Sequence, residues 1–168
     1  MKNIFILIIA FTVFSCENES YFDLGVTKFR EGKFEYAVNS FTKEIEVMPF
    51  NENAYYERGN SKYALLDYYG ALQDMDQAIE LKPHPAFLNN RSAINSRLGN
   101  YQGAIDDASK AIESKENFAD AFINRATAYS MLNQNNNAID DYTTLLGFQP
   151  DHILALLNRG VAYQKLDE

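Results

Sequence analysis

The sequence has one cysteine, two histidines and no tryptophan among its 168 residues. A single cysteine excludes an internal disulfide framework and a metal site built from several cysteines. Two histidines are too few for a catalytic or metal-binding histidine cluster. Basic residues are also scarce, because Lys and Arg number 15 against 23 Asp and Glu, a net charge of −8. We therefore expect no nucleic-acid partner, since the chain offers no basic stripe.

The sequence also lacks the short motifs of common catalytic sites. It has no Gly-x-Ser-x-Gly elbow, no His-Glu-x-x-His pair, no phosphate-binding loop and no Gly-x-Gly-x-x-Gly. No residue is therefore predicted to act as a nucleophile, a metal ligand or a cofactor contact. We expect a protein that is not an enzyme and that uses no cofactor and no metal.

One long apolar run stands near the amino terminus. Residues 4–14 are apolar except for Thr12, follow the positive start at Lys2, and end at Ser15-Cys16. Eleven positions suit a secretory signal and fall short of the ~18 needed to span a bilayer. The lone cysteine stands where a signal peptidase would cut, which resembles the lipobox of bacterial lipoproteins.

That resemblance implies a signal peptide over residues 1–16 and acylation of Cys16. Two or three acyl chains would anchor the protein stably in the bacterial cell envelope, at the outer membrane or the periplasmic face. The alternative is an ordinary cleaved signal and a secreted or periplasmic soluble protein.

The rest of the sequence repeats with a period of 33 to 34 residues. Three residue types share this period, and they are Ala37, Ala71, Ala104 and Ala138, then Pro49, Pro83 and Pro150, then Arg58, Arg91, Arg125 and Arg159. Each unit contains two stretches with apolar residues at helical spacing, separated by short turns such as Gly99-Asn100. No strand-type alternation is present. We therefore predict nine helices, with turns at Gly32-Lys33, Asp67, Gly99-Asn100 and residues 133–137.

The period and its residues resemble the tetratricopeptide repeat (TPR). The first unit carries Tyr21, Leu24-Gly25, Ala37, Phe41 and Pro49 at the places of the motif. The resemblance covers residues 18–168 and implies an all-α solenoid, a right-handed superhelix of about four and a half units. The units are 18–51, 52–84, 85–118, 119–152 and a half unit over 153–168.

The sequence departs from the TPR motif at one recurring position, where arginine replaces leucine. Sixteen residues after three of these arginines comes an aspartate, whereas the first unit has Leu24 and Ser40 at the two places. Because the two residue types occur together, we predict ion pairs between the helices of a unit. The pairs are Arg58 with Asp74, Arg91 with Asp107, and Arg125 with Asp141.

In this family the first helix of each unit lines a concave groove. By that resemblance the groove would present Asn90, Asn124, Asn158, Asn60, Tyr56, Tyr63, Phe22, Phe29 and Arg97. Asn90, Asn124 and Asn158 recur in step, and such a row of amides could bind the backbone of an extended peptide. The alternative is that these asparagines only tolerate solvent beside the arginines.

The amino-terminal half of the groove would have an aromatic floor, with Asp23 and Glu57 beside it. That favours a partner segment with apolar and basic side chains, although some of these aromatics could belong to the core. The two-carboxylate clamp of chaperone-binding members is not expected, because Asp120 and Asn124 stand at two of its cationic places.

The last predicted helix, residues 153–166, is apolar on more than one face. Either further sequence is missing or this helix packs against a partner, for example in a homodimer. The leading function is a membrane-anchored scaffold that binds proteins or peptides in its groove. The alternatives are a structural assembly subunit that acts through the convex face or the last helix, and the TPR fragment of a longer regulatory or enzymatic protein.

Overall fold

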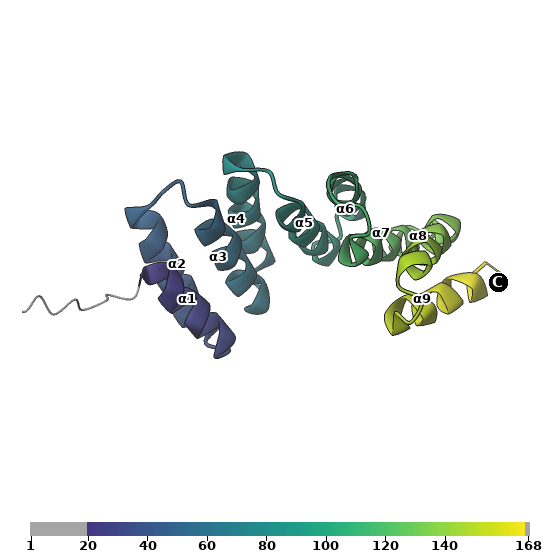
Figure 1. Cartoon of the computed structure of the whole chain (residues 1–168), viewed down its shortest axis with the longest axis horizontal. Helices are drawn as coiled ribbons and strands as arrows, with labels where there is room; N and C mark the ends of the chain where they lie inside the picture. Colours follow the sequence, from purple (N-terminus) through teal and green to yellow (C-terminus); the bar gives the residue numbers. More distant parts are fainter. Residues whose placement is uncertain (1–19, 167–168) are drawn as a thin grey trace, which may run out of the picture.

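The computed structural model describes residues 20–166. Within that range the chain forms nine α-helices and no strand, so the predicted all-α class is confirmed (Figure 1). The helices are α1 (Tyr21–Arg30), α2 (Phe34–Val47), α3 (Glu52–Ala64), α4 (Tyr68–Leu81), α5 (Pro85–Arg97), α6 (Tyr101–Ser114), α7 (Ala119–Met131), α8 (Asn135–Phe148) and α9 (Ile153–Gln164).

The helices form a solenoid in which each helix packs against the next one in the chain. We call the odd-numbered helices A helices and the even-numbered helices B helices. The pairs α1–α2, α3–α4, α5–α6 and α7–α8 follow one another along the long axis, and α9 lies at the far end (Figure 1). The A helices α1, α3, α5 and α7 also contact one another directly, so they line one face of the solenoid.

Each turn from an A helix to its B helix uses one residue with a positive φ. These residues are Gly32, Leu66, Gly99 and Asn133, at φ values of 73°, 65°, 78° and 57°. Glycine and asparagine adopt this left-handed conformation readily, whereas leucine is strained in it. The turn predicted over residues 133–137 is shorter in the structure, because the residue after Gln134 already begins α8.

Each histidine stands directly before a helix and caps its first turn. The Nδ1 atom of His84 accepts a hydrogen bond from the backbone N–H of Ala86, and His152 accepts one from Ala155 in the same way. Each ring therefore replaces the Ser or Asn side chain that caps α1 and α3. Pro85 follows His84 as the first residue of α5, where its missing N–H is not needed.

Small residues at the centre of the solenoid let the helices approach closely. The four alanines that define the repeat are fully buried on the B helices: Ala37, Ala71, Ala104 and Ala138. On the A helices, Gly25 and Gly59 meet the larger side chains of Phe41 and Met75. A Cβ atom at Gly25 would lie 2.6 Å from the Phe41 ring. At these two glycines the contact between the helices therefore leaves no room for a side chain.

The structure contains each of the three predicted ion pairs. In each one the Nε and Nη2 atoms of the arginine donate to the two oxygens of one carboxylate, over 2.6–3.0 Å. The pairs are Arg58–Asp74, Arg91–Asp107 and Arg125–Asp141. The carboxylates are buried, and burial raises the pKa of Asp141 although Arg125 acts in the opposite direction.

The same arginines also reach back to the preceding repeat. The Nη1 atom of Arg58 donates to Thr42 on α2 at 3.2 Å, and Arg125 donates to Ser109 on α6 at 3.0 Å. Arg91 bonds Asp76 on α4 at 2.7 Å. Each of these arginines therefore joins three helices, namely its own A helix, the B helix before it and the B helix after it.

The residues predicted to carry the membrane signal, 1–16 with Cys16, lie outside the described residues. Among residues 20–166, no helix combines the length and the apolar character required to cross a membrane.

We expect Asp107→Asn to lower the free energy of unfolding by about 3 kcal/mol, because it removes the buried carboxylate from the Nε and Nη2 atoms of Arg91 and leaves the guanidinium only the exposed Asp76. Urea unfolding followed by circular dichroism measures the change. Asp106→Asn is the matched control, since Asp106 is adjacent and exposed and, within residues 20–166, bonds only Gln102. Equal unfolding midpoints for the two variants would contradict the importance of the ion pair.

We expect Leu66→Gly to raise the free energy of unfolding by about 1 kcal/mol, because glycine removes the left-handed strain. The Leu66 side chain is 70% exposed, so little contact area is lost. Leu66→Ala keeps the Cβ atom and its strain and should give no such gain. If thermal unfolding shows that Leu66→Gly is less stable than Leu66→Ala, the turn is not strained.

Candidate binding groove

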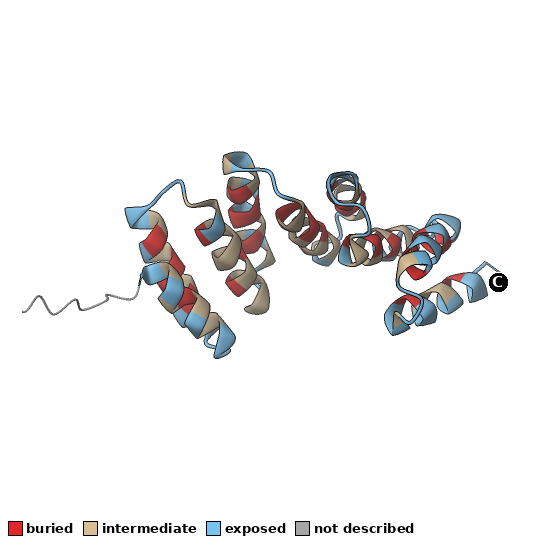
Figure 2. Cartoon of the chain, in the orientation of Figure 1, coloured by how far each residue is buried: buried red, intermediate tan, exposed pale blue. Residues whose placement is uncertain are grey.

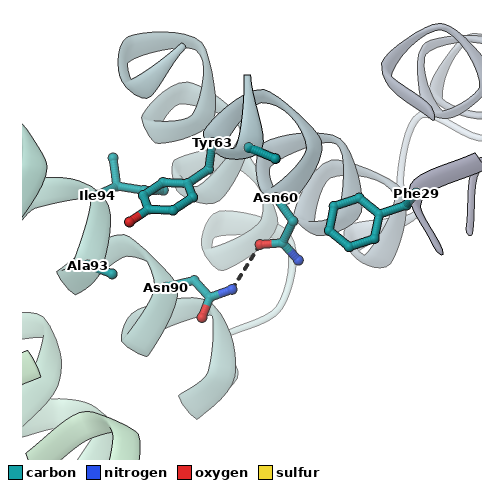
Figure 3. Close-up of a pocket in the computed structure, with 7 residues that line it drawn as sticks. Phe29, Asn60, Tyr63, Asn90, Ala93 and Ile94 are labelled. Carbon is teal, nitrogen blue, oxygen red and sulfur yellow. Dashed lines mark hydrogen bonds between the residues drawn. The ribbon is translucent and has the colours of Figure 1, made fainter. Parts of the chain in front are cut away.

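The exposed side of the A helices carries three pockets in a row. The first, of about 260 Å³, lies between α1, α3 and α5 and is shown in Figure 3. In Figure 3 the Phe29 ring lies beside Asn60, and Tyr63, Ala93 and Ile94 lie on the other side. The lining residues are Phe29, Asn60, Tyr63, Ala64, Asn90, Ala93 and Ile94.

The second and third pockets continue the first one toward the carboxyl end. The second has about 350 Å³ and the third about 140 Å³. Tyr63 and Ala93 line both the first and the second pocket, and Thr127 and Met131 line both the second and the third. Because neighbouring pockets share walls, they form one trough across α1, α3, α5, α7 and α9, which we call the A-face trough.

The asparagines of the predicted row are partly engaged inside the protein. The Nδ2 atom of Asn90 donates to Asn60 Oδ1 at 2.8 Å and to the Tyr56 hydroxyl at 3.1 Å. The Nδ2 atom of Asn124 donates to the side-chain and backbone oxygens of Asn89, at 2.9 and 3.2 Å. These amides therefore connect neighbouring A helices, so the N–H groups of Asn90 and Asn124 are engaged inside the protein.

Several polar atoms in the trough are still available to a ligand. The Asn124 side-chain oxygen and both polar atoms of Asn158 have no hydrogen bond within residues 20–166, and both residues line the trough. The Ser96 side chain also lines the second pocket, but its hydroxyl oxygen is buried and has no partner within residues 20–166. An extended peptide offers one backbone N–H and one C=O per residue, so it suits these groups.

The aromatic residues divide between the core and the trough. Phe22 packs edge-on against the buried Phe41 at a centroid distance of 5.6 Å and lines none of the three pockets. This placement in the core is the alternative that the sequence left open. Phe29 and Tyr63 line the first pocket. Tyr56 stacks on Phe87, and its hydroxyl holds Asn90 in place.

Charge in the trough is sparse and differs between its two ends. Arg97, in the second pocket, donates from Nε to the Tyr63 hydroxyl at 3.0 Å, which raises the pKa of Arg97. Lys165 lines the third pocket. Near the first pocket, burial raises the pKa of Glu57, while the hydrogen bond from Asn60 and the charge of Arg30 lower it. Glu57 stands one repeat before Asn90, so it occupies the same place in its repeat as the row of asparagines. Its side chain offers oxygens that accept hydrogen bonds.

Several trough residues were not predicted from the sequence, among them Ala93, Ser96 and Thr127. The repeat period could have identified two of them, because Ala93, Thr127 and Val161 recur 34 residues apart, three positions after the asparagines. Among residues 20–166, no three His, Cys, Asp or Glu side chains are placed to hold a metal ion.

Comparison with known proteins gives the fold. No family model matches the sequence. The human "Tetratricopeptide repeat protein 6" is 31% identical over 99 residues, which cover 59% of this chain and 19% of that protein. The chain spans less than a fifth of the first curated relatives it matches.

Solved structures match over more of the chain. The crystal structure of MamA protein has a TM-score of 0.81 and 22% identity, covering 88% of this chain and 81% of that one. The first TPR domain of Spaghetti (RPAP3), bound to the HSP90 peptide SRMEEVD, has a TM-score of 0.68 and 22% identity, covering 70% and 94%. The chain therefore has the fold of a tetratricopeptide-repeat solenoid, and its sequence is similar to TPR proteins.

Proposed function

We propose that the chain is a protein-binding scaffold that holds an extended segment of a partner in the A-face trough. The observation that carries this proposal is the continuity of the three pockets, because a single small ligand would need only one. The Spaghetti TPR domain, which has the same fold, is bound to a peptide. No part of the proposal involves catalysis, in line with the missing catalytic motifs.

The lining of the trough indicates what it would hold. The first pocket is lined mainly by carbon and suits an apolar side chain of the partner. Farther along, the oxygens of Asn124 and Asn158 can accept from backbone N–H groups, which every peptide has except at proline. Capture would therefore depend on an apolar anchor at one end and on backbone contacts at the other.

The trough is also pre-organised. The bonds from Asn90 to Asn60, and from Asn124 to Asn89, fix the A helices to one another before a ligand arrives. A rigid site loses less conformational entropy on binding than a flexible one. The internal bonds thus leave fewer donors for the partner and keep the remaining acceptors in fixed positions.

We expect Ala93→Phe to weaken peptide binding by about tenfold or more, because Ala93 lines two adjoining pockets and a phenyl ring there would fill them. The probe is a peptide selected on the wild-type chain from a random phage-displayed library, and fluorescence anisotropy measures its affinity.

Gln73→Phe is the matched control, since it adds the same ring at an exposed position of α4 outside the trough. Circular dichroism would verify that both variants fold. If Ala93→Phe binds the peptide as well as the control does, the trough is not the binding site. That result would favour a structural subunit that acts through its convex face.

We also propose that the protein is exported and anchored in the bacterial cell envelope through Cys16. The support is in the sequence alone: the positive start, the short apolar run and the placement of the lone cysteine. After removal of residues 1–15 the rest carries 14 basic and 23 acidic residues, so anionic lipids would not attract it. The acyl chains would then supply the membrane attachment.

We expect the chain, expressed in a bacterium, to incorporate an alkyne-tagged fatty acid, and Cys16→Ser to abolish the label, because serine offers no thiol for acylation. In-gel fluorescence after coupling of a dye measures the label. Ser15→Ala is the control and should be labelled like the wild type. Equal labelling of Cys16→Ser and the wild type would contradict acylation at Cys16, whether the protein is found in the membrane fraction or not.

A further inference from the structure

The loop between α2 and α3 carries three exposed apolar side chains, which we call the apolar tip. Val47 is 66% exposed, Met48 57% and Phe50 81%. In Figure 2 the end of α2 and the start of the loop have the colour of exposed residues. A hollow of about 540 Å³ at the tip is lined by residues 47–52, and no other helix within residues 20–166 contributes a wall. Single exposed apolar residues are common on proteins, whereas three within four positions form a patch.

The apolar tip is confined to the first repeat. Three later loops also join a B helix to the next A helix, and each takes the same place in its own repeat. Met48 corresponds there to Lys82, Lys115 and Gln149. Phe50 corresponds to His84, Asn117 and Asp151. The packing of a repeat therefore does not require apolar side chains at these two positions, and their presence in the first loop calls for a contact outside the solenoid.

Hydrogen bonds of Asn51 hold the loop in its shape. The Nδ2 atom of Asn51 donates to the buried carboxylate of Glu44 at 2.9 Å, and its backbone N–H donates to the Met48 carbonyl at 3.1 Å. The side-chain oxygen of Asn51 accepts from the backbone N–H of Ala54 at 3.3 Å and caps α3. Asn51 is thus bound to both helices, and the tip would have to break these bonds to fold back onto the solenoid.

The tip lies at the end of the first helix pair where α1 begins. The ring of Tyr21, the first residue of α1, lies 5.6 Å from the Nζ atom of Lys43 on α2. Val47 follows Lys43 after about one helical turn, a rise of about 6 Å. Four residues of chain connect Ser20 to Cys16, and they span at most about 14 Å when fully extended. An acyl chain on Cys16 would therefore enter a membrane within reach of the tip.

We infer that the apolar tip is a second membrane contact, placed in the interface of the bilayer that holds the acyl chains, and this rests on the anchor proposed at Cys16. The occupant follows from position, because the one apolar loop among the four is the loop nearest to the anchor. Three side chains alone would bind lipid weakly. An anchor keeps them at the surface, so their burial becomes an intramolecular step with a high effective concentration.

The charges around the tip define how deep it lies and which lipid suits it. Glu46 is exposed directly before the tip, and Glu52 follows it, paired with Lys82 at 3.4 Å. Carboxylates are costly in hydrocarbon, so only the tip itself enters the interface. Because the chain from Cys16 on carries 14 basic and 23 acidic residues, a zwitterionic surface suits it better than an anionic one. Two points of attachment would limit the rotation of the solenoid about its tether.

The absence of tryptophan from the sequence allows a site-specific probe. Phe50→Trp places a single tryptophan at the tip. Tyr69→Trp is the matched control, since Tyr69 is 73% exposed and stands near the start of α4, a full helix length away from the tip. The chain from Cys16 on is coupled through its only thiol to a maleimide lipid in phosphatidylcholine vesicles. This form retains the nine helices, which lie within residues 20–166, and circular dichroism would verify the fold.

Brominated acyl chains in the vesicles quench a tryptophan that touches them. We expect the fluorescence of the Phe50→Trp chain to fall about twofold or more relative to vesicles without bromine, and that of the Tyr69→Trp chain to stay unchanged. Unchanged fluorescence of the Phe50→Trp chain would overturn the inference. Equal quenching of both chains would overturn it as well, because the solenoid would then lie on the membrane without using the tip.

A further pair of variants separates apolar contact from mere nearness to the anchor. Met48→Asp, added to Phe50→Trp, leaves the position of the tip unchanged and should restore most of the fluorescence, because a carboxylate keeps the tip out of the bilayer. Asn53→Asp adds the same charge at an exposed position of α3 outside the tip and should leave the quenching as it was. Equal quenching with and without Met48→Asp would contradict an apolar contact.

The anchor and the tip can fail separately. The fatty-acid label tests acylation of Cys16, whereas the maleimide lipid supplies an anchor by chemical means. A labelled protein whose tip is not quenched would overturn the tip alone, and an absent label would overturn the anchor and the tip's membrane role with it. If the uncoupled chain dimerises in sedimentation velocity and Phe50→Asp prevents this, a second copy covers the tip and the inference is wrong.

Discussion

Each of three arginines connects an A helix to the B helices on both sides of it, and the stacking of the repeats depends on this arrangement. The fork of Arg91 holds Asp107 within its own unit, while its Nη1 atom reaches Asp76 in the unit before. A repeat protein is stabilised by contacts within units and between neighbours. The Arg91 side chain makes both kinds of contact. Loss of Asp107 therefore disturbs the contacts within its own unit and the contacts with the unit before.

On the opposite face of the A helices, the repeat brings uncharged amide side chains together instead of ion pairs. The 33- to 34-residue period brings equivalent positions of successive A helices side by side, so an amide in one unit meets an amide or a carbonyl in the unit before. These bonds use up donors that could have bound a peptide. The atoms left over are mainly acceptors, and an extended backbone supplies the matching N–H groups.

The fold was predictable from the sequence because the period appears in several residue types. The Arg–Asp pairs were predictable because the first unit, with Leu24 and Ser40, lacks both partners together. Lateral contacts between units were not predictable, since they depend on how far each repeat is rotated against the last. The bond from Asn124 to Asn89 is of this kind. The short turn before α8 was missed because Asn133 alone takes the left-handed conformation within a uniformly polar run.

The first and last A helices differ in a way that the repeat explains. In α1, Leu24 replaces the arginine, and the described residues contain no earlier B helix to receive a backward bond. In α9 the arginine is present and makes its backward bond to Thr143, while its Nε and Nη2 atoms have no hydrogen bond within residues 20–166. The backward bond therefore forms even where no carboxylate holds the other edge of the guanidinium, and it repeats the bond from Arg58 to Thr42.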